Sequence, residues 1–301
     1  MLWILLLLIM AAAAAPFVLE RRKPDMDDMV RGTAPGAFAN LSDGHTHYQW
    51  HGPDDGPVLV CVHGLTTPSY VWEPLLPGLT EAGFRVLTYD LYGRGFSDRP
   101  RGAQTRSFFI RQMRDLLADQ GVADGFTLMG YSMGGSIAAV FTAEEPQRAQ
   151  RLILLAPAGM VHSPSRVADF ARRTPVLGDW VMLAFGGREL RQIAKQMPAP
   201  QSIRNRLGAE TDWRGYLPAV LSSQRDLLAE ELEEEHRAIA QAQIPVSAIW
   251  GALDTVIPPA AIGKLTEWNR NTHQISVPDA DHALVMSHPD EVLAAMAETL
   301  G

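Results

Sequence analysis

Residues 126–135, FTLMGYSMGG, join an apolar run to a stretch rich in small residues. The run before Gly130 predicts a buried strand, and the small residues from 134 to 139 predict a helix that lies close to a sheet. Gly130 and Gly134 flank Ser132 in the pattern G-x-S-x-G. A serine at the tip of so tight a turn is strained, and bulk two positions away would clash, which accounts for the glycines. The stretch therefore predicts strand, sharp turn and helix, with Ser132 at the tip.

The chain around this stretch alternates between strand and helix from about residue 45. Apolar strands are predicted over residues 47–51, 57–62, 84–90, 126–130, 151–156, 244–251 and 274–277. Helices are predicted over residues 70–82, 108–120 and from 288 onward. Continuous apolar strands alternating with helices imply a parallel sheet covered on both faces. Ligands of such sheets bind at the carboxyl ends of the strands, where His63, Asp90 and Ser132 fall.

The alternation stops between residues 161 and 243, where the pattern is helical and several prolines interrupt it. We therefore expect an α/β core over residues 41–160 and 244–301, with a helical cap over residues 161–243. The cap would cover the carboxyl ends of the strands. Its apolar residues Phe170, Trp180, Met182, Leu183, Phe185 and Met197 either line a pocket or form the packing core of the cap.

The first nineteen residues carry no charged side chain and are followed by Glu20, Arg21, Arg22 and Lys23. Their length is close to the roughly 20 residues that span a bilayer as a helix. The run Ala11–Ala15 offers cleavage sites of a signal peptide, whereas the lack of a basic residue before the apolar run favours a retained anchor. We expect residues 1–23 to be a membrane anchor, with export after signal-peptide cleavage as the alternative. The basic cluster would keep the following chain in the cytoplasm, and residues 24–40 would be a polar linker.

Bulk properties exclude several classes of function. The 301 residues carry a formal net charge of −8 and no basic stripe, which argues against a nucleic-acid partner. Cys61 is the single cysteine, so no disulfide forms within the chain. No C-x-x-C or H-E-x-x-H spacing occurs, and neither a metal nor an organic cofactor is expected.

Three chemistry-bearing residues follow successive strands in the order Ser132, Asp254, His282. With them stand H-G-L at 63–65, D-L-Y-G-R-G-F-S at 90–97, W-G-x-x-D at 250–254 and D-H at 281–282. On these motifs the chain resembles the α/β-hydrolase superfamily from about residue 45 to 299. It is most similar to monoacylglycerol-lipase-like and carboxylesterase-like members with a helical cap, and to C–C hydrolases of aromatic ring cleavage. Some monoacylglycerol lipases also carry an N-terminal membrane anchor.

The resemblance implies a role for each residue. Ser132 is the expected nucleophile, His282 the base that takes its proton, and Asp254 the carboxylate that orients the imidazole. The elbow geometry makes the backbone N–H of Met133 one oxyanion donor. By resemblance, the backbone N–H of Leu65 is the other.

Two residues compete for these roles. Asp90 also follows a strand, but the glycine-containing loop after it indicates a structural carboxylate. His63 is expected to be a hydrogen-bonding residue of its own turn. Ser132 stands where haloalkane dehalogenases and epoxide hydrolases have an aspartate nucleophile, so the sequence disfavours those activities.

We expect a serine hydrolase of apolar acyl esters, working through an acyl-enzyme. The alternative is a C–C bond hydrolase with the same triad, whose small anionic substrates would need an arginine such as Arg188 or Arg191 in the pocket. A non-catalytic ligand-binding member of the fold is disfavoured because such members usually lose a triad residue.

Overall fold

The computed structural model describes residues 1–161 and 166–300. At its centre lies an eight-stranded sheet with the order β1-β2-β4-β3-β5-β6-β7-β8. The first two strands are antiparallel to their neighbours, and all pairings from β4 to β8 are parallel. The strands are β1 (Ala37–Leu41), β2 (Gly44–His51), β3 (Val58–Val62), β4 (Arg85–Tyr89), β5 (Phe126–Tyr131), β6 (Ala149–Leu155), β7 (Val246–Gly251) and β8 (His273–Val277).

Successive side chains of the central strands point to opposite faces of the sheet, and both faces are buried. In β3, Val60 and Val62 belong to one hydrophobic cluster, and Leu59 and Cys61 to the other. Parallel strands buried on both sides must be apolar throughout, so the continuous apolar runs in the sequence predicted this sheet correctly.

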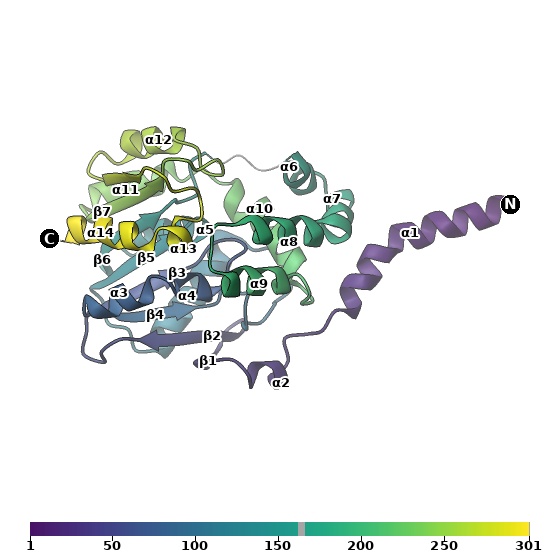
Figure 1. The fold of residues 1–301 in the computed structure, drawn as a ribbon, viewed down its shortest axis with the longest axis horizontal. Helices are drawn as coiled ribbons and strands as arrows, with labels where there is room; N and C mark the ends of the chain where they lie inside the picture. Colours follow the sequence, from purple (N-terminus) through teal and green to yellow (C-terminus); the bar gives the residue numbers. More distant parts are fainter. Residues whose placement is uncertain (162–165, 301) are drawn as a thin grey trace.

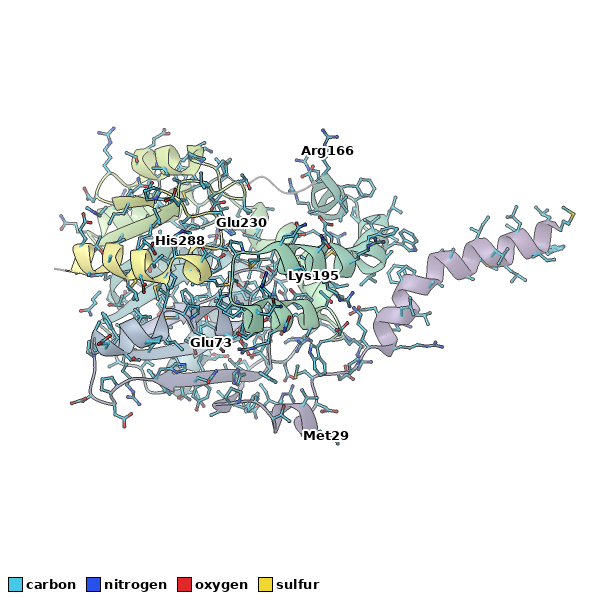
Figure 2. All side chains as sticks on the ribbon, in the orientation of Figure 1. Met29, Glu73, Arg166, Lys195, Glu230 and His288 are labelled. Atoms are coloured by element: carbon cyan, nitrogen blue, oxygen red, sulfur yellow. The ribbon has the colours of Figure 1, made fainter. Side chains whose placement is uncertain are left out.

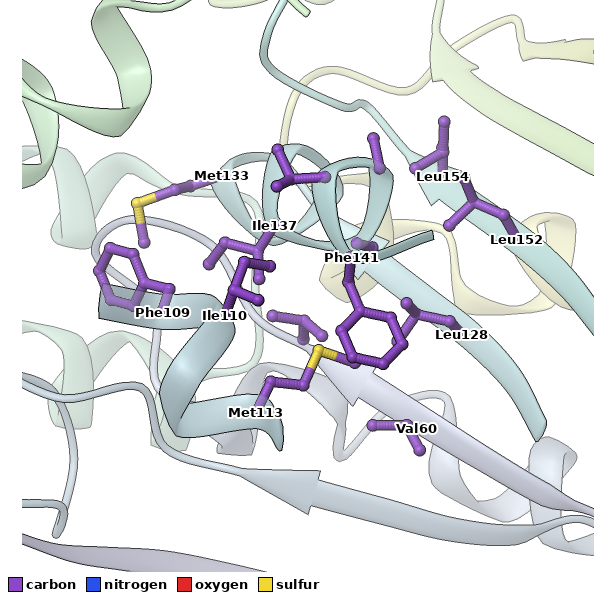
Figure 3. Close-up of a cluster of buried hydrophobic side chains, with 14 of the residues drawn as sticks. Val60, Phe109, Ile110, Met113, Leu128, Met133, Ile137, Phe141, Leu152 and Leu154 are labelled. Atoms are coloured by element: carbon purple, nitrogen blue, oxygen red, sulfur yellow. The ribbon is translucent and has the colours of Figure 1, made fainter. Parts of the chain in front are cut away.

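Helices cover each face of the sheet (Figure 1). One face packs against α4 (Arg106–Asp119), α5 (Met133–Glu144), α11 (Glu233–Gln241) and α12 (Ala260–Trp268). The other packs against η1 (Ser69–Trp72), α3 (Leu76–Glu81), α13 (Leu284–Ser287) and α14 (Pro289–Leu300). Figure 3 shows Phe109 and Ile110 of α4 beside Met133 and Ile137 of α5, and Met113 of α4 near Phe141 of α5. This packing fixes α5, and with it the turn at Ser132.

The chain between β6 and β7 is helical in its described residues. Its elements are α6 (Arg166–Arg173), α7 (Leu177–Val181), the π-helical η2 (Met182–Gly186), α8 (Gly187–Gln196), α9 (Gln201–Glu210), α10 (Tyr216–Arg225), η3 (Leu227–Ala229) and α11. Residues 162–165 of the predicted cap lie outside the described residues. In Figure 1, α6 to α10 lie at one end of the sheet, on the side from which the N-terminal helix projects.

The N-terminal helix α1 (Leu2–Arg22) is long and apolar enough to cross a membrane, and almost all of it is exposed. The segment after it differs from the predicted linker. It contains the short helix α2 (Asp28–Arg31), and residues 37–41 pair with β2 as an edge strand. The sequence missed this strand because Ala37 to Leu41 alternate weakly and follow a Gly-Pro-rich stretch.

The helix predicted over residues 70–82 is wrong in its continuity. A 3₁₀ turn, η1, ends at Trp72, and α3 begins at Leu76 with Pro77 in its first turn. Proline lacks an N–H and is best tolerated in the first turn of a helix, so Pro77 favours the start of a second helix there.

Candidate active site

Ser132 lies between β5 and α5 in a backbone conformation that few residues adopt, with φ 54° and ψ −118°. Hydrogen bonds hold this strained turn: its N–H donates to Leu155 O at 2.9 Å, and its carbonyl accepts from Gly135 and Ala158. The turn has no space for larger neighbours, since a Cβ at Gly130 would collide with the Gly134 carbonyl. A Cβ at Gly134 would collide with the Val62 carbonyl. The predicted strand, turn and helix are therefore confirmed, together with the reason for both glycines.

Two loops that follow β7 and β8 bring a carboxylate and an imidazole to Ser132. His282 Nε2 lies 3.0 Å from Ser132 Oγ, and His282 Nδ1 lies 2.8 Å from Asp254 Oδ2. The other oxygen of Asp254 accepts from the N–H groups of Val256 and Ile257, both at 2.8 Å. This buried carboxylate is thus fixed on both oxygens and makes His282 Nδ1 a donor, which leaves Nε2 free to accept a proton. The structure brings together the three side chains that the sequence singled out.

The backbone N–H groups of Leu65 and Met133, both near Ser132, have no acceptor in the described part of the chain. Met133 begins α5, where the first N–H groups of a helix lack intrahelical partners. Leu65 lines the same cavity as Ser132.

The peptide that carries the Leu65 N–H is held by its neighbours. His63 Nε2 accepts from the Leu91 N–H at 2.8 Å, so Nδ1 is protonated and donates to the Gly64 carbonyl at 2.8 Å. Burial lowers the pKa of His63 to about 4, which keeps it neutral and this tautomer intact. Arg94, fully buried, donates from Nε to the Leu65 carbonyl at 2.9 Å. The prediction that His63 is a hydrogen-bonding residue of its turn is confirmed.

Asp90, the rival carboxylate, forms its hydrogen bonds with groups outside the triad. Its oxygens accept from the N–H groups of Ser69 and Phe96, at 2.8 and 2.9 Å, and one lies 2.8 Å from His47 Nδ1. Burial favours the neutral acid, but His47 and the hydrogen bonds outweigh it and hold the pKa of Asp90 well below its usual range. Asp90 therefore ties the loop after β4 to β2, as its glycine-rich loop predicted.

Beside the triad lies a cavity of about 680 Å³ between the sheet and the cap. Its walls are mostly apolar, and its charged lining residues in the described chain are Glu189 and Asp281, with no lysine or arginine. The cap side chains in these walls include Val167, Ala171, Val181, Met182, Leu190, Ile193, Met197 and Val220.

Only two of the cap side chains proposed for a pocket, Met182 and Met197, line this cavity. Phe170 and Phe185 are exposed instead. Trp180 and Leu183 turn toward α1: the Trp180 indole donates to the Ala12 carbonyl, and Leu183 lines a second cavity of about 500 Å³ with Phe17 and Val18. Arg188 and Arg191 are absent from the walls of the catalytic cavity, and Arg191 pairs with Asp212 at 2.5 Å.

Sequence reasoning missed Arg94, whose guanidinium also donates to Tyr92 O and Ser223 Oγ and so joins the cap to the loop at Leu65. An arginine between two glycines directly after a predicted strand was the available signal. Among residues 1–161 and 166–300, no three or more His, Cys, Asp or Glu side chains are arranged to hold a metal ion.

Residues 57–180 match the model of the alpha/beta hydrolase fold family. An uncharacterised protein of Mycobacterium tuberculosis is 28% identical over 231 residues, which are 67% of this chain and 63% of that protein. The chain thus spans less than two thirds of that relative. A haloalkane dehalogenase of Mycolicibacterium paratuberculosis is 28% identical over 70% of this chain and 72% of its own. A pimeloyl-[acyl-carrier protein] methyl ester esterase of Aeromonas salmonicida is 26% identical over 82% of this chain and 96% of its own.

Solved structures share the architecture. A membrane phospholipase A, described as a bacterial virulence factor, aligns with a TM-score of 0.70 and 22% identity over 99% of this chain and 96% of its own. A meta-cleavage product hydrolase of Pseudomonas fluorescens aligns with a TM-score of 0.71 and 16% identity over 88% of this chain and 97% of its own. At these identities the likeness concerns the fold. Together with the family match over residues 57–180 and the parallel sheet, it shows that the chain has the alpha/beta hydrolase fold.

Proposed function

We propose that this hydrolase cleaves carboxylic esters with apolar acyl groups, through Ser132, His282 and Asp254. His282 Nε2 takes the proton of Ser132 Oγ as this oxygen attacks the ester carbonyl carbon. The tetrahedral intermediate then collapses, the C–O bond to the alcohol breaks, and His282 returns the proton to the leaving alcohol. Water, deprotonated by His282, repeats the sequence on the acyl-enzyme and releases the acid and free Ser132.

The negative oxygen of the tetrahedral intermediate would accept from the N–H groups of Leu65 and Met133. Donors fixed before the reaction stabilise the charge as it develops, and each contributes roughly 3–4 kcal/mol in comparable sites. The contacts of His63 and Arg94 with the peptides around Leu65 supply that fixation.

The observation that carries the ester proposal is the cavity beside Ser132. Its apolar walls suit an acyl chain. Among the described residues, no lysine or arginine lines the cavity to bind an anionic substrate. This disfavours the C–C hydrolase alternative, because small anionic diketones need a positive partner. A dehalogenase is disfavoured by bond chemistry: an alkyl group transferred to Ser132 would form an ether, which water does not cleave as it cleaves an ester on a carboxylate nucleophile.

The substrate is proposed to be a lipid ester of the monoacylglycerol type, and α1 a retained membrane anchor. One contact supports retention of the residues that signal-peptide cleavage would remove: the Trp180 indole donates to the Ala12 carbonyl at 3.2 Å. Two further bonds join the chain after the predicted cleavage site to the cap. The buried Glu20 accepts from the Gly215 N–H at 2.7 Å, and the Arg214 N–H donates to Pro24 O at 2.9 Å. These bonds make the end of α1 and the chain after it part of the folded cap. The Arg21-Arg22-Lys23 cluster would hold the catalytic domain in the cytoplasm.

The enzyme test compares p-nitrophenyl esters from acetate to palmitate on wild type, Ser132→Ala and Asp254→Asn. We expect wild type to prefer medium to long acyl chains and Ser132→Ala to lose turnover. Asp254→Asn presents an amide N–H to His282 Nδ1 and so favours the wrong tautomer, which lowers kcat by about 10³- to 10⁴-fold. The exposed Asp279→Asn is the matched control. No turnover of any ester by a folded wild-type protein would reject the proposal.

The anchor test is the mass of the protein extracted from membranes. The intact N-terminus is expected, and loss of residues 1–15 would establish cleavage instead. Protease protection of the catalytic domain in right-side-out vesicles would support the cytoplasmic orientation, and ready digestion from outside would reject it.

A further inference from the structure

Exposed large apolar side chains outside α1 concentrate in one part of the cap. Val167, Phe170, Val176, Leu177, Phe185 and Ile193 belong to α6, the turn after it, α7, η2 and α8. We call these six residues the apolar rim. Figure 1 shows α6 and α7 on the side of the molecule from which α1 projects, and Figure 2 shows Arg166 at the outer end of α6. Soluble surfaces rarely gather so many large apolar groups without a partner.

The turn between α6 and α7 displays its apolar residues at a conformational cost. Val176 has φ 64° and ψ −60°, and the Leu177 N–H donates to Pro175 O at 2.7 Å. These values describe a classic γ-turn, which is strained, and a β-branched residue rarely adopts a positive φ. Val176 is nevertheless 74% exposed and Leu177 52%. Packing inside the protein therefore does not account for this strained apolar tip.

A hydrogen bond between α7 and α1 fixes the position of the cap along the N-terminal helix. Pro16 lacks an N–H, so the carbonyl of Ala12, four residues earlier, has no helical donor. The Trp180 indole of α7 supplies the missing donor at 3.2 Å. An unpartnered carbonyl is costly in lipid, and this bond removes that cost.

This bond places α7 beside the middle of α1 rather than beside its charged end. Ala12 precedes Arg21 by nine residues, which is about 13 Å along a helix. A bilayer core of about 30 Å would need nearly the whole of α1. If α1 crosses the hydrocarbon core, α7 and the residues next to it lie deeper in the bilayer than Arg21. A cap docked in this way cannot stay clear of the membrane.

The catalytic cavity opens on the same side of the cap. Val167 and Ile193 line the cavity beside Ser132 and are also exposed members of the apolar rim. Met182 lines this cavity and also the one between the cap and α1. The rim therefore connects the surface next to α1 with the cavity that holds the nucleophile.

We propose that the apolar rim inserts into the bilayer that α1 crosses, with Val176 and Leu177 deepest, so that a lipid ester passes from the membrane into the catalytic cavity past Val167 and Ile193. The occupant of this surface is the lipid bilayer. The inference rests on the proposed anchor and on the proposed lipid-ester substrate. Its first test does not depend on turnover.

That test measures depth. Single cysteines at Val176 and Leu177 are labelled with an environment-sensitive fluorophore in the full chain, reconstituted into vesicles of phosphatidylcholine and phosphatidylglycerol. Native Cys61 is fully buried and escapes labelling. Asp54→Cys, at a fully exposed side chain in the loop between β2 and β3, is the control. We expect several-fold stronger quenching by spin-labelled lipid at both rim positions than at position 54, and protection from iodide there.

Equal quenching at the rim and at position 54, or full access of iodide to both, would overturn the proposal. A mass of the reconstituted protein that shows residues 1–15 to be missing would also overturn it, because Ala12 and its contact with Trp180 would then be absent.

The second test uses Val176→Asp combined with Leu177→Asp. Neither residue lines the catalytic cavity, and aspartate tolerates a positive φ better than valine. Turnover of a soluble short-chain ester should stay within about twofold of wild type. Turnover of monoacylglycerol in vesicles should fall at least about tenfold, because a charge at the tip opposes insertion. The exposed Met29→Asp is the control and should change neither rate.

Equal loss on both substrates would assign the rim a structural role and overturn the proposal, as would no loss on either. Absence of all ester turnover, in wild type as well, would reject the proposed function, while the depth measurement would still decide membrane insertion.

Discussion

The peptide between Gly64 and Leu65 is fixed by a side chain that takes no proton from substrate. His63 Nδ1 donates to its carbonyl, and the same peptide carries the N–H proposed to bind the oxyanion. His63→Ala should lower kcat by about 10- to 100-fold and leave KM nearly unchanged, because a misaligned donor weakens the transition state more than the substrate complex. Steady-state kinetics on a p-nitrophenyl ester measures both constants.

His63→Asn separates positioning from general loss of structure. Its side-chain amide can donate to the Gly64 carbonyl, so part of kcat should return. A fall in the melting temperature of His63→Ala with kcat unchanged at a temperature where it remains folded would contradict the positioning role.

At the level of single residues, the sequence predicted much of the candidate active site. Ser132, Asp254 and His282 were found because each follows a strand of a parallel sheet, and such ends meet at one edge. The role of Arg94 and the contact of Trp180 with α1 were not predicted. Both side chains donate to backbone carbonyls, those of Leu65 and Ala12. Every residue has such a carbonyl, so the residue type does not indicate which one accepts the bond.

Helix α11 carries the buried His236, whose unpaired ring nitrogens lower the stability of the fold, and a substitution can remove this destabilisation. Both ring nitrogens of His236 lack a hydrogen-bond partner within the described chain, and the ring stacks on Trp268 at 6.1 Å. Burial lowers the pKa of His236 to about 4 from 6.5. The unfolded chain therefore binds a proton between pH 6.5 and 4 that the folded protein does not, so the free energy of unfolding falls as the pH falls through this range.

His236→Phe should keep the stacked ring and abolish this proton linkage. The loss of unfolding free energy between pH 6.5 and 4 should shrink by about 1 kcal/mol per pH unit, and stability at pH 8 should be equal or higher. Denaturant unfolding at several pH values checks this. The exposed His273→Gln is the control and should leave the slope unchanged. An unaltered acid slope in His236→Phe would contradict the assignment.

The positions of strands and helices were predicted where the segment is buried on both faces. They were missed where contacts with neighbouring segments determine the local structure. The strands from β3 to β8 lie within a few residues of their predicted ranges. For β3 to β7 the reason is that both faces of the strand are covered and demand apolar side chains, whereas in the edge strand β8 only Val277 is buried. The edge strand β1 needed β2 as a partner before Ala37 to Leu41 became extended. In the cap, Trp180 and Leu183 were predicted to line a pocket or to form the packing core, because their own sequence cannot reveal that α1 lies beside them.

Two segments that lie far apart in the sequence are joined by hydrogen bonds: the end of α1 with the chain just after it, and the turn between α9 and α10. The Gly215 N–H donates to Glu20, and the Arg214 N–H donates to Pro24. Neither bond contacts the triad. Removal of residues 1–26 should therefore loosen this turn while the chemistry on soluble esters persists, since β5 and α5 are held by the core.

Amide hydrogen exchange tests this coupling in the full chain and in the chain without residues 1–26. The amides of Arg214 and Gly215 should exchange at least about tenfold faster after the deletion, and those of β5 should not change. Glu20→Ala in the full chain should accelerate Gly215 far more than Arg214, because only the first of the two bonds involves its side chain. Equal protection at both positions in all three proteins would mean that the cap holds this turn without the N-terminal segment, and α1 would then be tethered to the cap rather than docked on it.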